Sequence, residues 1–296
     1  TDFTRLTPQA NGTSFAGRDG RLNNVTVDGA NLNNNFGLSS DPLPGGGGNP
    51  VSLDAIEEVS INIAPYDVRQ ANFTGANISA ITKSGTNTFK GTAYTFYRDQ
   101  SFNGLHAGDV KLPKQANNTN KTYGASLGGP IIKDKLFFFA NYEHSAKSNI
   151  LNFYNPTGGS TSGNTSAVPI GTMQTISDYL KSKYNYDPGT FDNFNTSSPI
   201  TNHTLLAKID WNISQVHKLT LKYNDYLNSQ TFLPSQSGGI NGASSTGLVT
   251  YGPKFSPIAM AFGNTVYTQN DKVQSGSFEL SSNFKGKFAN QLLATY

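Results

Sequence analysis

Alternation of apolar and polar residues with a period of two is the main pattern along this chain. Between positions 204 and 212 the odd-numbered residues are apolar, whereas the even-numbered residues include Lys208 and Asp210. The segments 218–227 and 272–284 show the same separation, with Leu221 and Phe278 on the apolar parity. Successive side chains of a strand point to opposite faces of its sheet. The pattern therefore predicts strands that have one apolar face and one polar face.

About seven such strands are expected after position 87, at 88–98, 122–129, 135–145, 203–212, 218–227, 272–284 and 288–296. The connections between them alternate in length. Those at 99–121, 146–202 and 228–271 are long, and those at 130–134, 213–217 and 285–287 are short. Outer-membrane barrels have short periplasmic turns and longer extracellular loops. The spacing thus favours a transmembrane barrel wall over a soluble β-sandwich, the alternative in which the aromatic residues form a core.

The strand expected at 135–145 is apolar on both parities at its start, so its orientation needs a choice. We expect Leu136, Phe138, Ala140 and Tyr142 to face outward. Trp211 and the tyrosines near the strand ends suit the aromatic girdles of a membrane protein. Both features agree with a wall that has lipid on one side and a polar lumen on the other.

The first part of the chain predicts a small α+β domain. The runs 22–27, 59–63 and 77–82 have strand patterns, and a short helical turn is expected within 54–59. The turn-forming residues at 83–87 then end the pattern, and 85–87 is interpreted as a hinge. We therefore divide the chain at residues 1–86 and 87–296.

Composition removes several function classes. Charged residues make up 14% of the chain, against about 25% in soluble proteins, and no run of about 20 apolar residues occurs. The net charge of +3 is spread along the sequence, so nucleic-acid binding is not expected. Cysteine is absent, and the four histidines show no zinc-motif spacing, so neither a catalytic residue, a metal site nor a cofactor is predicted. The histidines are His106, His144, His203 and His217.

Three motifs resemble those of TonB-dependent outer-membrane receptors: LDAIEEV at 53–59, ITKSGTN at 81–87, and SLGGPIIKDKLFFF at 126–139. More narrowly, they resemble the Oar-like branch, which carries a carboxypeptidase-regulatory-like domain. The motifs SFAGRDGR at 14–21 and VDGANLNN at 27–34 resemble its plug in the Bacteroidetes-type form. The resemblance implies an all-β transmembrane barrel of 22 strands around an N-terminal α+β plug. On this interpretation the chain is an internal fragment that holds an incomplete plug and about seven antiparallel strands of the barrel.

The resemblance also implies a function in the bacterial outer membrane. Extracellular loops and the plug would capture a ligand, such as a peptide, a glycan or a chelate, and TonB would drive its import. TonB would act through a missing N-terminal segment, and outer-membrane lipid and lipoproteins are the other expected partners. The alternative is an adhesive or structural barrel that binds a partner without transport. No enzymatic activity is implied.

Candidate site residues follow from the same assignment. We expect a plug loop to contact ligand through Tyr66, Asp67, Arg69, Gln70 and Asn72. We expect plug–barrel contacts from Arg18, Arg21, Glu57 and Glu58.

The long connection 146–202 contains one further pattern. Met173, Ile176, Tyr179 and Leu180 are spaced as on an amphipathic helix over 172–184. This helix would serve either as a ligand lid or partner surface, or as the packing element of its own loop, and the sequence favours neither.

Overall fold

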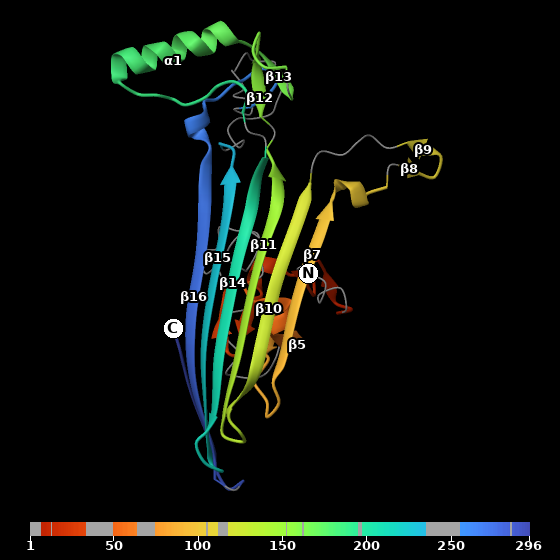
Figure 1. The fold of residues 1–296 in the computed structure, drawn as a ribbon, viewed down its shortest axis with the longest axis vertical. Helices are drawn as coiled ribbons and strands as arrows, with labels where there is room; N and C mark the ends of the chain where they lie inside the picture. Colours follow the sequence, from red (N-terminus) through yellow and green to blue (C-terminus); the bar gives the residue numbers. More distant parts are fainter. Residues whose placement is uncertain are drawn as a thin grey trace.

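A tall antiparallel sheet of seven strands, the large sheet, dominates the computed structural model (Figure 1). The structure describes residues 7–12, 14–33, 50–63, 75–104, 106–111, 118–151, 153–161, 163–194, 197–234, 255–284 and 286–296. The strand order is β17-β16-β15-β14-β11-β10-β7, so neighbours in space are also neighbours along the chain among these long strands. The sheet is open, with β7 at one edge and β17 at the other.

The seven predicted strands are confirmed, but most of their ends were placed too early or too late. The observed bounds are β7 (Lys90–Asp99), β10 (Thr119–Ile132), β11 (Leu136–Ile150), β14 (Ser197–Asn212), β15 (His217–Phe232), β16 (Tyr267–Asn283) and β17 (Ala289–Thr295). Six strands extend further toward the long connections than alternation indicated, β7 by a single residue. Beyond the apolar band the side chains on both faces are polar, so alternation stops while the backbone ladder continues, as in the pairs Asn202–Asn228 and Asn228–Asp271.

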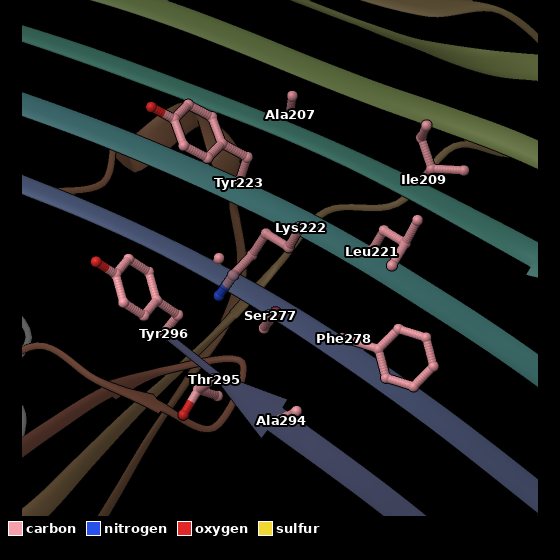
Figure 2. A pocket seen from close by; sticks show the side chains of 11 residues that line it. Ala207, Ile209, Leu221, Lys222, Tyr223, Ser277, Phe278, Ala294, Thr295 and Tyr296 are labelled. Atoms are coloured by element: carbon pink, nitrogen blue, oxygen red, sulfur yellow. The ribbon is translucent and has the colours of Figure 1, made fainter.

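The two faces of the large sheet have the predicted character. Leu205, Ile209 and Trp211 are each at least 40% exposed on the outward face, whereas Leu206 and Lys208 are buried on the inward face. In β11 the inward residue Phe139 is buried, which confirms the outward orientation of the opposite parity. Figure 2 shows Leu221, Tyr223 and Phe278 side by side on the outward face, where they line a shallow groove together with Ala207 and Gly276.

A second sheet of four strands forms the basis of the small domain, which we define as the described residues between 7 and 82. Its strand order is β4-β3-β6-β5, and only the β3–β6 pair is parallel. The strands are β3 (Asn24–Val27), β4 (Ala30–Asn31), β5 (Ile56–Ile63) and β6 (Ala76–Thr82), preceded by the short pair β1 (Ala10–Asn11) and β2 (Ser14–Phe15). Figure 1 shows this domain against one face of the large sheet.

Two local predictions for the small domain need correction. Gly20–Leu22 is a 3-10 turn, η2, so the strand expected from Leu22 begins at Asn24. The helical turn expected within 54–59 is the 3-10 turn η3, Leu53–Ala55, and Ile56 already belongs to β5. The Ser52 side chain caps this turn by accepting a hydrogen bond from the Asp54 backbone, and the extended backbone of Ile56 ends it.

The apolar core of the small domain is shared with the large sheet. Val27, Ala55 and Ala80 pack in one buried cluster with Phe139 of β11 and Leu206 of β14. The chain crosses from β6 to β7 through Gly85, where a Cβ atom would lie 2.3 Å from the Phe138 carbonyl oxygen. Only a residue without a side chain fits this close approach. The two sheets are therefore held together by apolar packing and by the connecting segment.

The end of the large sheet that carries the long connections supports a separate folded unit, which we call the loop unit. It contains α1 (Ile170–Tyr184), η5 (Gly263–Thr265), and the parallel pair β12 (Tyr154–Thr157) and β13 (Asn164–Pro169). The predicted helix is thus confirmed and begins two residues earlier than the pattern suggested. Phe153, Phe194 and Phe255 form its aromatic core, in which the first two rings stack at 4.5 Å. Two connections distant in sequence fold together here.

The connection after β7 carries η4 (Gln100–Phe102) and the short hairpin of β8 (His106–Ala107) and β9 (Val110–Lys111). Among the helices that the structure describes, none has the length and apolar character needed to span a membrane.

Candidate functional site

Two lysines of the large sheet reach the small domain. Lys208 of β14 and Lys222 of β15 are direct cross-strand partners, and both are buried on the inward face. The Lys222 ammonium donates a hydrogen bond to the Val27 carbonyl oxygen at 2.7 Å. The Lys208 ammonium donates to the Thr82 carbonyl oxygen at 3.2 Å. A buried ammonium needs acceptors, and these two find theirs on the backbone of the small domain.

Asp28 supplies the negative charge at this contact. It occupies the turn after β3 with a left-handed backbone, φ 46°, which a following glycine completes. Its carboxylate accepts hydrogen bonds from the Thr82 backbone at 2.8 Å and from the Thr82 hydroxyl at 2.6 Å. The same carboxylate lies 3.3 Å from the Lys222 ammonium. Asp28 therefore joins β3 to β6 and at the same time offsets the charge of Lys222.

A second contact lies between β7, β11 and the turn that precedes β5. The Ser52 hydroxyl donates to the Glu143 carboxylate at 3.0 Å and lies 3.0 Å from the Tyr94 hydroxyl. Tyr94 also donates to the same oxygen of Glu143. One residue of the small domain thus closes a ring of three polar side chains.

A third contact surrounds Asp54. Its carboxylate accepts a hydrogen bond from the Thr92 hydroxyl of β7 at 2.6 Å and lies 3.4 Å from the Lys83 ammonium. Burial raises the pKa of Asp54, but hydrogen bonds from Ser126 and Thr92 and the charge of Lys83 outweigh it, so the pKa lies below its ordinary value. Asp54 is therefore an ionised partner of the large sheet at neutral pH.

These three contacts share one chemical character. Each pairs a side chain of the large sheet with a charged or hydrogen-bonding group of the small domain. Nearby inward residues also have unpaired polar atoms, such as the side-chain amide of Asn224, among the described residues. A polar inward face of this kind is typical of a barrel lumen. These hydrogen bonds and ion pairs form only when the small domain occupies this one position on the large sheet.

Comparison with known proteins identifies the architecture. Residues 81–292 match the family model described as an outer membrane beta barrel domain. The chain belongs to this outer-membrane β-barrel family. Its location is the bacterial outer membrane, and the large sheet is a wall of the barrel type, with one face toward lipid and the other toward the lumen.

The resemblance to TonB-dependent receptors of the Oar type is also supported. The TonB-dependent transporter Oar of Myxococcus xanthus is 27% identical over an alignment of 252 residues, which covers 79% of this chain and 22% of the relative. The chain thus spans about a fifth of the length of the curated relative that it matches. The Bacteroidetes-type form and the interpretation as an internal fragment stay predictions.

Solved structures agree on the fold. The outer-membrane transporter YddB of Escherichia coli superposes with a TM-score of 0.58 at 14% identity, covering 95% of this chain and 32% of that one. The siderophore receptor PirA of Acinetobacter baumannii gives a TM-score of 0.55 at 13% identity, with the same coverage of 95% and 32%. At these identities the comparison shows a shared fold for the outer-membrane barrel sheet and the small domain.

The residues predicted to contact ligand, from Tyr66 to Asn72, lie outside the described residues and stay predictions. Of the four predicted plug–barrel residues, Arg21 is exposed and pairs with Asp19 at 2.8 Å, where its hydrogen bond lowers the pKa of Asp19 to about 2. Arg18, Glu57 and Glu58 are exposed as well. Within the described part of the chain no ion pair joins these four residues to one another, and their contact with the barrel stays a prediction.

The residues that join the small domain to the large sheet in the described part of the chain were not singled out from sequence. They include Asp28, Ser52, Asp54, Thr82, Thr92, Tyr94, Glu143, Lys208 and Lys222. One signal could have found the lysines. Lys208 and Lys222 stand on the lumen parity of their strands, where a long cation needs an acceptor. No comparable signal marks Asp28 as the acceptor.

Proposed function

We propose that this chain is the plug and barrel-wall region of a TonB-dependent transporter that imports a ligand across the outer membrane. The observation that carries the proposal is the seating of the small domain on the lumen face by the Asp28–Lys222 pair and the Lys208–Thr82 hydrogen bond. A passive pore has no need for a folded domain held against its inner wall. Such a domain obstructs the lumen and must move before a ligand passes.

The chemistry of the contact suits a movable plug. The bonds at Lys222, Glu143 and Asp54 are polar, so water entering behind a displaced plug can replace each of them. The apolar part is small, and the large sheet contributes the buried Phe139 and Leu206 and the partly buried Val273 to it. A pull on a segment N-terminal to the small domain would break these contacts in sequence, and they would re-form on release. TonB is the proposed source of the pull.

Ligand capture is assigned to the extracellular side. The loop unit has its own aromatic core, so it can hold a binding surface in a fixed shape. Helix α1 leaves Ile176, Tyr179 and Tyr184 exposed on this unit. The loop that contains Tyr66, Asp67, Arg69, Gln70 and Asn72 is the proposed plug contribution. A peptide, a glycan and a chelate remain the candidate ligands, and an outer-membrane lipoprotein the candidate partner.

The second candidate is a barrel that binds a partner without transport, and the rigid loop unit is the observation that favours it. Uptake assays separate the two functions. Cells with the protein or lacking it, each with and without TonB, would be given labelled oligopeptides, oligosaccharides and ferric chelates.

The transport function predicts that one probe enters the periplasm only when the protein and TonB are both present. A binding barrel predicts protein-dependent retention of a probe at the cell surface that TonB does not change. Periplasmic entry that is independent of TonB would contradict the proposal.

A further inference from the structure

Two histidines that are far apart in sequence meet on the outward face of the large sheet. His144 of β11 and His203 of β14 are direct cross-strand partners, next to the outward pair Tyr142–Leu205. Their Nδ1 atoms lie 3.2 Å apart, and the ring centroids are separated by 4.2 Å. Both side chains are half-buried, so solvent still reaches them. The fold therefore creates a pair of converging imidazole nitrogens.

Two tyrosines frame this pair. The Tyr142 hydroxyl lies 3.1 Å from Nδ1 of His203. The Tyr123 ring packs on the other side against His144, with centroids 4.9 Å apart. The two imidazoles are thus held between aromatic neighbours, which limits rotation about their side-chain bonds. The position is toward the extracellular ends of β11 and β14, at the margin of the apolar band.

We propose that His144 and His203 form a binding site for a divalent transition-metal ion such as Cu²⁺, Ni²⁺ or Zn²⁺. Imidazole nitrogens bind these ions at about 2.0–2.1 Å, so two ligands in tetrahedral geometry are about 3.4 Å apart. The observed 3.2 Å separation of the Nδ1 atoms matches this value without any rearrangement of the strands. Imidazole nitrogens are suitable ligands for all three of these ions.

The remaining coordination positions are open. Among the residues that the structure describes, no group of three or more His, Cys, Asp or Glu side chains surrounds a common point. Water would fill the other positions, and the Tyr142 hydroxyl can hydrogen-bond to one such water. The site should bind Cu²⁺ more tightly than Ni²⁺ or Zn²⁺. A bound ion would fasten β11 to β14 just below the loop unit.

The sequence predicted no metal site, because the spacing of the four histidines fits no linear motif. Cross-strand pairing, rather than spacing, brings two of them together. His217 lies at the opposite end of the large sheet, and its Nδ1 is 2.8 Å from the Ser282 hydroxyl. His217 therefore offers a matched control with a single imidazole.

The test compares metal binding by the purified protein in detergent micelles with that of three variants. Cu²⁺ and Zn²⁺ would be titrated calorimetrically into wild type, His144→Gln, His203→Gln and His217→Gln. We expect the first two variants to bind at least about tenfold more weakly at one site, because each removes a direct ligand. His217→Gln should match wild type. Paramagnetic resonance of the Cu²⁺ form should show coupling to two nitrogens in wild type and to fewer in His144→Gln.

Circular dichroism of each variant establishes that the β-sheet is intact. A wild-type protein that binds neither ion would overturn the proposal. Equal affinities in wild type, His144→Gln and His203→Gln would overturn it as well, and would leave a simple hydrogen-bonded histidine pair.

Discussion

The Lys222 ammonium lies 3.3 Å from the Asp28 carboxylate, although the two residues belong to different sheets. The Lys222 side chain is only 1% exposed and that of Asp28 16%. Thr82 holds this carboxylate in place through its backbone N–H, which donates to one oxygen, and its hydroxyl, which donates to the oxygen that lies near the lysine. This ion pair forms only when the small domain is docked, and it links that domain directly to the large sheet.

Lys222→Met should weaken docking of the small domain. Removal of one partner of a buried ion pair costs about 3–5 kcal/mol, because the other charge is left without compensation. Hydrogen exchange of the β3 and β6 backbone amides would measure the change in opening free energy. Lys272→Met, on the exposed face of the neighbouring strand, is the control and should change it by less than about 0.5 kcal/mol. Equal exchange rates in wild type and Lys222→Met would contradict the assignment.

The two faces of β15 predict opposite responses to an inserted charge. Leu221 is 41% exposed on the outward face between Ile209 and Phe278, so Leu221→Arg should destabilise the barrel by about 2–4 kcal/mol near the bilayer midplane. Thr220 faces inward between Asp210 and Glu279, and Thr220→Arg would gain ion pairs there. Urea titrations of folding into lipid vesicles measure both costs. If Leu221→Arg destabilised the barrel less than Thr220→Arg does, Leu221 would face the lumen and Thr220 the lipid.

Gly85→Ala should disturb the segment that connects the small domain to the large sheet. The added Cβ would meet the carbonyl oxygens of Phe138 and Gly129 at 2.3 and 2.8 Å, and neither backbone group can move freely. Overpacking of this kind costs about 1–3 kcal/mol. Gly171→Ala is the matched control, because a Cβ at that helical position meets nothing within 4 Å. In thermal unfolding, the midpoint temperature should fall for Gly85→Ala and should not fall for Gly171→Ala.

Sequence patterns predicted the strands well because the membrane imposes a simple rule on them. Alternation at Leu205–Trp211 and around Leu221 reports a lipid face and a lumen face, and both assignments hold in the structure. The rule ends where the apolar band ends. The residues 197–202 and 267–271 therefore gave no strand signal, although their backbones continue the ladder.

The candidate site was much less predictable. The contacts of Lys222 with Asp28 and of Ser52 with Glu143 depend on where one sheet docks on another, and no periodicity records this. The same applies to His144 and His203, which only the strand register brings together. Glu57 and Glu58, expected to contact the barrel, lie exposed on β5, and that contact stays a prediction.

Phe153→Ala should unfold the loop unit without affecting the large sheet. The Phe153 ring stacks on Phe194 at 4.5 Å and meets Phe255 edge-on at 5.1 Å, so its loss leaves a cavity that costs about 3–5 kcal/mol. Limited proteolysis of whole cells should then cleave within the loop unit. Tyr179→Ala, on the exposed side of α1, should leave the cleavage rate unchanged. Resistance of Phe153→Ala equal to wild type would show that the two connections do not depend on one core.

If the small domain leaves the large sheet when TonB acts, cysteine labelling in living cells should detect the movement directly. Ala80 is 7% exposed in the shared cluster with Phe139 and Leu206, and the chain has no cysteine, so Ala80→Cys would introduce one buried thiol. Lys133→Cys, exposed in a short turn, is the control and should react at one rate in all strains. We expect a periplasmic maleimide to label Ala80→Cys faster in cells that have TonB than in cells that lack it, because movement of the small domain exposes the thiol. Equal labelling of Ala80→Cys with and without TonB would contradict it.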